Sequence, residues 1–302
     1  MQLDLAIMGR GSVVTIGNFD GVHLGHRALI ERLIDTSKRL KTKSMVFTFD
    51  PPPLKLLRPE ITPKPLTWNA RRAELLNRLG VDQILFYPTN TDLLRLTPVE
   101  FFERILIDQL GIRGIVEGPN FRFGQSRAGD IQTLKELANQ HRIAIEIIAS
   151  QNSDQKMISS TQIREAIQTG NIRTANQLLS EPYHIRGTVG HGAARGRTLG
   201  FPTANLEQVE VLVPPHGVYA ARGVAPSSVA GKPIALHIGP NPTFGEDASK
   251  IEAHIVGFEG NLYDDLLELE LIDSVRAVRK FESKEDLLAQ LDRDIAQVVA
   301  LQ

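Results

Sequence analysis

The chain has 302 residues, of which 42% are hydrophobic, with no cysteine and a formal net charge of −1, so we expect about two domains with ordinary globular cores. The lack of cysteine excludes disulfides, thiolate nucleophiles and cysteine-ligated metals, and the near-neutral charge argues against nucleic-acid binding, which needs a basic face. There is no apolar run near the roughly 20 residues of a membrane span and no signal-peptide pattern at the N-terminus, so we expect a cytoplasmic protein without membrane or nucleic-acid partners.

Strand and helix patterns alternate through the first half of the chain. We expect strands at residues 12–16, 46–49, 83–86, 112–116 and 143–148, and helices at 29–40, 69–79, 97–110 and 130–140. This alternation predicts an α/β domain, in which helices cover both faces of a parallel sheet. Ligands of such sheets bind at the carboxyl ends of the strands, so His23, Asp50 and Gly118, which each follow a strand, should lie on one rim.

The run Gly17–His26 follows the first strand and contains two histidines that flank Gly25. Its glycines allow a tight turn and a close backbone approach to a ligand. The N-terminus of the following helix supplies free N–H groups and a positive dipole end, which suit a phosphate, and His23 and His26 add two imidazoles. We interpret the run as a nucleotide-triphosphate site. A zinc pair and a purely structural turn are alternatives that the spacing leaves open.

Two further loops follow strands of this domain. Asp50 begins a proline-rich loop, where it either binds a cation or caps the turn. In the loop Gly118–Gly124, Asn120 can bond a ribose or phosphate oxygen, and Arg122 or Arg127 can neutralise a phosphate. Alternatively, this second loop has only a structural role, and its two aromatic side chains serve to fill space.

Helices are expected to begin at Ser159, with capping-box spacing, and at Ile172. The hydroxyls of Ser160 and Thr161 either satisfy the N–H groups of the helix end or bind phosphate oxygens, and Arg164 can reach the same anion. A well-capped helix with a surface arginine is the alternative. Because the chain has no Walker A motif, phosphate binding rests on the histidine turn and not on a P-loop lysine.

Attack on the α-phosphate of ATP is the chemistry that these residues suit. In-line transfer needs positioning and charge neutralisation more than covalent catalysis. His23, His26 and Arg164 would stabilise the charge that builds on the phosphate and on the departing pyrophosphate. No general base is needed when the nucleophile is itself a phosphate.

The second half has frequent glycine and proline and short strand patterns without intervening helices. Strands are expected at residues 218–220, 234–237, 251–258 and 267–271, which predicts a small β-barrel or sandwich. A final helix begins at Ser283. Its predicted apolar face consists of Leu287, Leu288, Leu291, Ile295 and Val298. We place the boundary near residues 181–185, which gives domains of residues 1–183 and 184–302.

A glycine-rich segment, Gly187–Asn205, opens the second domain, with glycines at positions 187, 190, 192, 196 and 200. We expect a mobile loop whose backbone N–H groups wrap phosphates, with positive charge added by Arg195 and Arg197. Thr203 and Asn205, at the end of the segment, are oxygen ligands acceptable to Mg²⁺. Glu252 lies on the polar face of a strand, where it is either a general base for a substrate hydroxyl or a solvated residue.

Eight motifs in order across both domains resemble those of the bifunctional bacterial riboflavin kinase/FAD synthetase family. They are GNFDGVHLGH, FTFDPPP, GPNFRFG, ISSTQIR, GRTLGFPTAN, PPHGVYA, IGPNPTF and IEAHIV. The resemblance implies a Rossmann-like nucleotidyltransferase domain that makes FAD from FMN and ATP. It also implies a six-stranded flavokinase barrel with a C-terminal helix that makes FMN from riboflavin and ATP. Both activities use Mg²⁺, and the expected partners are these small molecules, with the protein a monomer or weak homo-oligomer.

The resemblance also implies roles for individual residues. His23, His26 and Arg164 would be catalytic in adenylyl transfer, and Glu252 would activate the ribityl hydroxyl. The residues expected to bind ATP are Gly17, Phe19, Asp20, His23, Gly25, His26, Asn120, Ser160, Thr161, Arg164, Gly192, Gly196, Arg197 and Thr203. Those expected to bind flavin are Asp50, Phe123, Gly200, Pro202, Asn205, Glu252 and Arg276, and those expected to bind metal are Thr203 and Asn205.

Four positions depart from the usual family pattern. Pro52 stands in place of a histidine, Gly257 in place of an aspartate, Asp264 in place of a glycine and Val278 in place of a glutamate. Because the last three lie in the kinase half, the alternative function is an FAD synthetase whose barrel binds flavin without phosphorylating it. A non-catalytic flavin-binding protein is a further alternative, against which the retained histidine pair and arginine argue, since sensing needs no transition-state stabilisation.

Overall fold

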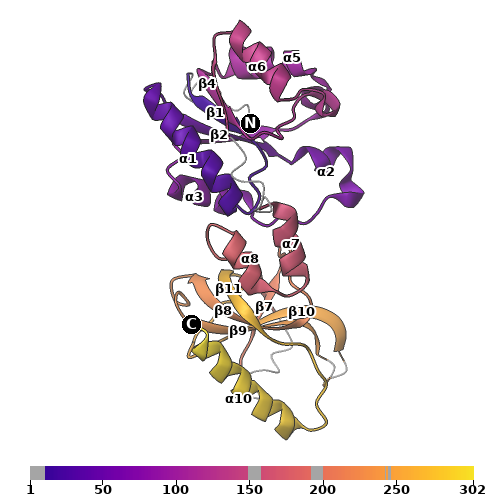
Figure 1. The fold of residues 1–302 in the computed structure, drawn as a ribbon. Helices are drawn as coiled ribbons and strands as arrows, with labels where there is room; N and C mark the ends of the chain where they lie inside the picture. Colours follow the sequence, from indigo (N-terminus) through magenta and orange to yellow (C-terminus); the bar gives the residue numbers. More distant parts are fainter. Residues whose placement is uncertain (1–10, 149–157, 192–199, 242, 244–245) are drawn as a thin grey trace. The chain divides into compact units, whose positions relative to one another are not determined.

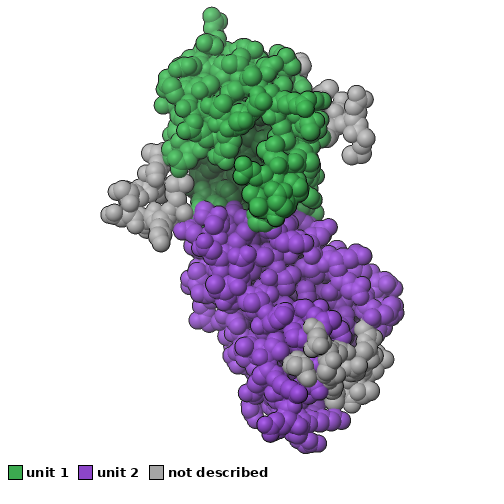
Figure 2. Space-filling view, turned by 90° about the vertical axis from the view of Figure 1, so that its right-hand side faces the viewer, with its two compact units in different colours: residues 1–63, 69–158 green, residues 64–68, 159–302 purple. Residues whose placement is uncertain are grey.

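The computed structural model describes residues 11–148, 158–191, 200–241, 243 and 246–302. By its internal contacts the chain divides into two compact units, shown in Figure 2: unit 1 comprises residues 1–63 and 69–158, and unit 2 comprises residues 64–68 and 159–302. The two expected helices after Ser159 thus group with the second unit by contacts. None of the helices in the described part of the chain is both long and apolar enough to cross a bilayer.

Unit 1 is built on a five-stranded parallel sheet, which confirms the α/β prediction (Figure 1). Its strands are β1 (Val13–Ile16), β2 (Ser44–Asp50), β3 (Gln83–Pro88), β4 (Gly114–Glu117) and β5 (Ala144–Ile147). They lie in the order β3-β2-β1-β4-β5. The order reverses beside β1, because β2 and β3 lie on one side of it and β4 and β5 on the other.

Helices cover both faces of this sheet. Val13 of β1 belongs to the same buried cluster as Ile30 of α1 (Leu24–Arg39) and Leu76 of α3 (Asn69–Arg78). Val14 belongs to the opposite cluster, with Phe102 and with residues of α6 (Ile131–Gln140). Successive side chains of a strand point to opposite faces, so strands covered on both faces are apolar throughout. The shorter elements are α2 (Pro53–Leu57), η1 (Pro59–Ile61), α4 (Thr91–Arg95) and η3 (Gln125–Arg127).

The helix expected over residues 97–110 has a different form from the one predicted. Thr97 caps α5 (Pro98–Glu100) in a reciprocal capping box with Glu100, and the chain continues as the π-helix η2 (Phe101–Gln109). At its end the N–H of Leu110 donates to the carbonyl of Ile105. The apolar residues of η2 recur every four positions, a spacing typical of an α-helix, so periodicity alone does not distinguish the two forms.

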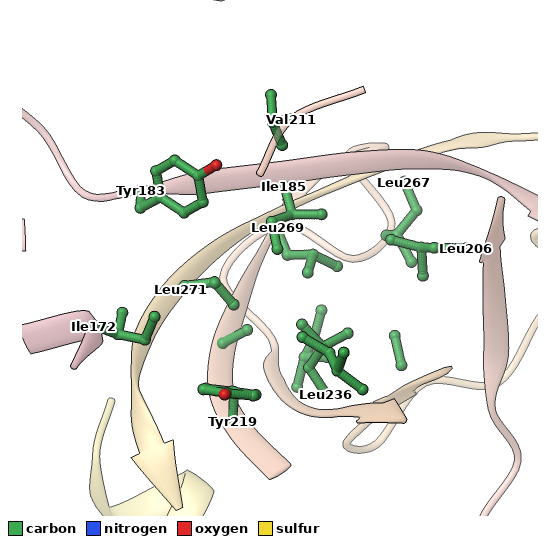
Figure 3. Close-up of a cluster of buried hydrophobic side chains, with 14 of the residues drawn as sticks. Ile172, Tyr183, Ile185, Leu206, Val211, Tyr219, Leu236, Leu267, Leu269 and Leu271 are labelled. Carbon is green, nitrogen blue, oxygen red and sulfur yellow. The ribbon is translucent and has the colours of Figure 1, made fainter. Parts of the chain in front are cut away.

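Unit 2 contains a closed six-stranded antiparallel barrel in the order β10-β7-β6-β11-β8-β9, as the resemblance implied. Its strands are β6 (His184–Gly190), β7 (Ala204–Glu207), β8 (Gly217–Ala225), β9 (Pro233–Asn241), β10 (Glu246–Ile255) and β11 (Leu266–Arg276). Its helices are α7 (Ser160–Gln168), α8 (Ile172–Leu178) and α10 (Lys284–Ala300). Figure 3 shows Leu206, Leu236 and Leu267 within the buried cluster that fills the barrel.

The expectation of a glycine loop from residue 187 is wrong for its first part. Gly187 and Gly190 lie in β6, and β6 pairs with β7. A Cβ on Gly187 would stand 2.6 Å from the carbonyl oxygen of Glu207, and one on Gly190 would overlap the Glu207 side chain. These glycines therefore serve the close approach of two strands. Gly192, Arg195, Gly196 and Arg197 lie outside the described residues.

Helix α10 begins where expected, since the Ser283 side chain caps it by accepting from the N–H of Asp286. Its inner face carries a charge that the apolar pattern did not predict. Asp294, only 2% exposed, accepts hydrogen bonds from Nε and Nη2 of Arg276 at 2.9 and 2.7 Å on one oxygen. Gln290 donates to its other oxygen at 2.7 Å. This ion pair ties α10 to the end of β11.

Replacing Asp294 with alanine should destabilise unit 2. The Arg276 side chain is 19% exposed and would lose its carboxylate partner, which for a mostly buried pair costs about 2–4 kcal/mol of unfolding free energy. Urea unfolding followed by circular dichroism measures the change. Asp292→Ala, an exposed site on the same helix, is the matched control and should stay within about 0.5 kcal/mol of wild type. Equal stability of the two variants would contradict a stabilising role for the pair.

Candidate active sites

The carboxyl ends of β1, β2 and β4 bring the predicted residues of unit 1 to one edge of the sheet. The turn Gly17–His26 follows β1, Asp50 ends β2, and the loop Gly118–Gly124 follows β4. Because the strand order reverses beside β1, this edge contains the topological switch point where open α/β sheets bind their ligands.

The two histidines of the turn form a stacked pair. His23 is the N-cap of α1, and its Nδ1 accepts from the N–H of His26 at 3.3 Å. The two rings stack with centroids 3.6 Å apart, and the ring of Phe19 lies 4.9 Å from that of His26. Among the described residues, the buried Nδ1 of His26 has no hydrogen-bond partner. The pair thus offers polar groups at a helix N-terminus that already attracts anions.

Both imidazoles are neutral at neutral pH. Burial lowers the pKa of His23 to about 4, against the opposing attraction of Asp20. Burial also lowers the pKa of His26 well below its usual value, and the positive charge of Arg72 adds to this effect. The zinc alternative gains no support, because the described residues contain no group of three or more His, Asp or Glu side chains that could hold a metal ion.

The backbone of the turn is held in an unusual conformation. Phe19, Gly21 and Val22 all have positive φ, at 47°, 83° and 39°. For a β-branched residue such as Val22 this region is strained, and strain of this kind concentrates at functional sites. Gly25 has a steric reason to be glycine, since a Cβ there would lie 3.0 Å from the carbonyl of Ile158 and 3.1 Å from the His23 ring.

The other predicted residues of unit 1 have defined partners. Asp50 accepts from the side-chain amide of Asn69 at 2.9 Å. Asn120 lines a pocket of about 390 Å³ together with Arg122 and Arg127. Phe123 is buried in the core and stacks on the half-buried Phe121. The Asp20 carboxylate lies 3.6 Å from the buried guanidinium of Arg72.

The predicted phosphate-binding residues at the start of α7 belong to unit 2 by contacts. Ser159 and Gln162 form the expected reciprocal capping box, so Ser159 caps the helix. Ser160 and Thr161 follow it in the first turn, and Nε of Arg164 donates to the carbonyl of Lys64 at 3.2 Å. Their role beside the histidine turn stays a prediction.

On the barrel, the register brings Asn205 and Glu252 together. Glu252 of β10 pairs with Asn205 of β7 on one side and with His237 of β9 on the other. Their neighbours Leu206, Ala253 and Leu236 are buried in the core, so this row of three faces outward. The side-chain amide of Asn241 donates to Glu252 Oε2 at 2.8 Å. Burial lowers the pKa of His237, while Glu252 opposes the shift.

Thr203 and Pro202 precede this row and line a pocket of about 330 Å³ with Val189, Leu262 and Tyr263. Nδ1 of His254 is bonded to the Pro202 carbonyl at 2.8 Å. Gly200 has a φ of 85°, where glycine is favoured. Arg276, predicted to bind flavin, is engaged by Asp294 as described above.

Two of the departing positions share the same positive φ. Gly257 and Asp264 both have a φ of 66°, a region where glycine is unstrained and aspartate is better tolerated than most residues. The carbonyl of Gly257 accepts from Nζ of Lys232 at 3.1 Å. Glycine and aspartate are therefore both compatible with this φ at positions 257 and 264.

Three residues with evident roles were not predicted. Asn241 orients Glu252, and its only signal was its place in the motif IGPNPTF. Asp294 occupies a core position of α10, and its spacing from Leu287 and Val298 could have revealed it. Glu117 is a buried carboxyl at the end of β4, where a charged residue after an apolar run is itself a signal.

Comparison with known proteins finds a matching family for each half of the chain. The model of the FAD synthetase family matches residues 7–162, and that of the riboflavin kinase family matches residues 179–301. A curated bifunctional riboflavin kinase/FMN adenylyltransferase from Pseudomonas fluorescens is 36% identical over 295 residues, covering 97% of this chain and 93% of that protein. The protein of the same name from Escherichia coli (strain K12) is 34% identical over 286 residues, covering 94% and 90%.

A solved structure shares the fold across both units. The crystal structure of a protein from Streptococcus pneumoniae, described as a macrolide-efflux protein, has a TM-score of 0.84 with this chain at 29% identity. The match covers 96% of this chain and 94% of the chain from Streptococcus pneumoniae.

Acid should destabilise unit 1 through the histidine pair. His23 has a pKa of about 4 in the folded chain and an ordinary value of 6.5 when unfolded, so the unfolded state binds more protons between these values. The stability from neutral His23 is complete above about pH 6.5 and is lost, by about 3 kcal/mol, as pH falls toward 4. His23→Asn keeps a capping acceptor and should flatten the pH dependence of urea unfolding. His141→Asn, elsewhere in unit 1, is the control; the same slope in both variants would contradict the assignment.

Proposed function

We infer that this chain, which belongs to the bifunctional riboflavin kinase/FMN adenylyltransferase family, carries its two activities on successive parts of the chain. It phosphorylates riboflavin to FMN and adenylylates FMN to FAD, using ATP in both steps. The observation that carries this conclusion is that two family models match successive parts of one chain, with bifunctional relatives matching over more than nine-tenths of its length. The main function is therefore supported over an FAD synthetase that has lost its kinase.

In adenylyl transfer, we propose that unit 1 binds ATP along the turn Gly17–His26 and beside Asn120. A phosphate oxygen of FMN attacks the α-phosphorus of ATP. A new P–O bond forms, the bond to the β-phosphate bridging oxygen breaks, and pyrophosphate leaves with the electron pair. The FMN phosphate is already anionic, so no base is required. His23 and His26, neutral before binding, donate hydrogen bonds to the phosphates or take up a proton as negative charge gathers near them.

In riboflavin phosphorylation, we propose that Glu252 is the general base. It accepts the proton of the terminal ribityl hydroxyl while that oxygen attacks the γ-phosphorus of ATP, and ADP leaves. The amide of Asn241 holds the Glu252 carboxylate at 2.8 Å, which fixes the direction of its other oxygen. The pocket beside Thr203 and Pro202 supports ATP binding next to this row.

Mg²⁺ is part of this proposal for both activities. Asn205 lies opposite Glu252 in the register of β7 and β10, and Thr203 precedes it by two residues. The hydroxyl of Thr203 and the amide oxygen of Asn205 are hard oxygen donors, which suit Mg²⁺ together with substrate phosphates. When bound, the ion would neutralise phosphate charge. The flavin roles of Asp50, Phe123, Gly200, Pro202 and Arg276 are likewise proposals.

The extent of each functional domain, the cellular location and the oligomeric state belong to the same proposal. We assign adenylylation to residues 1–183 and phosphorylation to residues 184–302, with residues 163–178 lying between the two family matches. We further propose that the enzyme acts in the cytoplasm as a monomer or weak homo-oligomer with small-molecule substrates.

His26→Ala should strongly slow FAD formation and leave riboflavin phosphorylation intact. Removing one group that stabilises transition-state charge lowers kcat by about 100- to 1,000-fold, and the kinase residues lie in the other unit. Chromatography of riboflavin, FMN and FAD after incubation with ATP and Mg²⁺, started from riboflavin or from FMN, measures both steps. His141→Ala is the matched control. Undiminished FAD formation by His26→Ala would overturn the adenylyltransferase assignment.

Glu252→Gln should give the reciprocal result. Loss of a general base lowers the rate of FMN formation by about 100- to 10,000-fold, while FAD formation from supplied FMN continues. Glu285→Gln, an exposed carboxylate on α10 of unit 2, is the control in the same assay. Normal FMN formation by Glu252→Gln would show that another group takes the proton.

A further inference from the structure

The backbone pairing between β1 and β4 ends before the two strands do. The register of β1 with β4 contains two pairs, Val13 with Gly114 and Val14 with Ile115. On its other side, β1 stays paired with β2 as far as Ile16. The strands on either side of the switch point therefore separate over their last two residues. This leaves the backbone N–H of Ile16 without a β4 backbone partner in that register.

The side chain of Glu117 fills this gap. Its Oε1 accepts from the N–H of Ile16 at 2.7 Å and lies 3.5 Å from the hydroxyl of Thr15. The residue is 2% exposed. One buried carboxyl group thus replaces the missing backbone bond and joins the ends of β1 and β4.

The end of β1 and the end of β4 each lead directly into a loop of the proposed ATP site. Ile16 is followed directly by the histidine turn, and Gly118 begins the loop that carries Asn120. On the β2 side, the first residue of the histidine turn is also held: the N–H of Gly17 donates to the Phe47 carbonyl at 3.0 Å. Glu117 therefore sets the separation of the two loops, since it ends β4 directly before Gly118 while its carboxyl group accepts from the N–H of Ile16 at the end of β1.

We propose that Glu117 is a positioning residue for FAD synthesis, whose side chain holds the histidine turn and the Asn120 loop at the spacing that ATP requires. This inference rests on the proposed adenylyltransferase function. The hydrogen bond to Ile16 requires an oxygen acceptor as far from the backbone as the end of a glutamate side chain. It does not require that this acceptor be negatively charged. Burial raises the pKa of Glu117 well above its usual value, and both a protonated carboxyl group and an amide retain the accepting oxygen.

Three substitutions separate reach from charge. Glu117→Gln keeps the reach and the acceptor and removes the ionisable group. Glu117→Asp keeps an ionisable carboxyl group but withdraws the acceptor by one methylene, and Glu117→Ala removes both. A displacement of about 1 Å at a positioned group costs on the order of 100-fold in kcat/KM. We expect a loss of that size for FAD formation, carried largely by a higher KM for ATP, in Glu117→Asp and Glu117→Ala. Glu117→Gln should stay within a few-fold of wild type.

The measurement is steady-state FAD formation from FMN at varied ATP, with riboflavin phosphorylation by the same full-length chain as the internal control. Urea titration at the assay temperature gives the folded fraction that corrects each kcat, whereas KM does not depend on that fraction. Should the alanine variant not fold, the Gln and Asp variants alone decide the question.

Three outcomes would overturn the inference. They are a Gln variant as impaired as the Asp variant, an Asp variant equal to wild type, or losses in kcat that the folded fraction explains with KM for ATP unchanged. Failure of the wild-type chain to make FAD would instead overturn the proposed function, so the two failures are distinguishable.

Discussion

The burial of both faces of the parallel sheet decides where chemistry can occur in unit 1. Alternate side chains of β1 and β2 enter two separate apolar clusters under α1 and α3 on one side and under η2 and α6 on the other. Neither face can accept a charged substrate without exposing that core. The predicted site residues of unit 1 instead follow the strands at the carboxyl edge, and the reversal of strand order beside β1 opens that edge at one point.

The barrel of unit 2 meets the same constraint with a different geometry. Its interior is filled by one apolar cluster, so the groups that we propose to react lie on the outer surface. Antiparallel pairing places residues from three strands in one row, and Asn205, Glu252 and His237 come together although they are distant in sequence. Alternation along each strand then separates this row from the core. In both units, packing decides the location of the site before any catalytic side chain is considered.

The limits of prediction follow from the same physics. Periodicity predicted the parallel sheet, and the capping signals at Ser159 and Ser283 predicted two helix starts, because both depend on neighbouring residues. Strand β6 was taken for a loop, because glycines 187 and 190 carry no strand signal until Glu207 is known to pack against them. The bonds of Glu117 to Ile16 and of Arg276 to Asp294 join residues that tertiary folding brings together. No local pattern encodes such pairs.

The protonation state of the histidine pair also follows from burial. A permanent cation at the mouth of α1 would add to the positive helix end and to Arg72, and burial would make that charge expensive in the free protein. Neutral imidazoles avoid this cost while the site is empty. In the proposed ATP site, the negative charge of a bound triphosphate would favour the protonated form, so positive charge would develop only where a compensating negative charge is present. Under that proposal, burial of His23 and His26 makes the positive charge of the site depend on the ligand that it binds. A lysine, whose ordinary pKa lies far above neutrality, would stay charged in both states unless burial shifted it by several units.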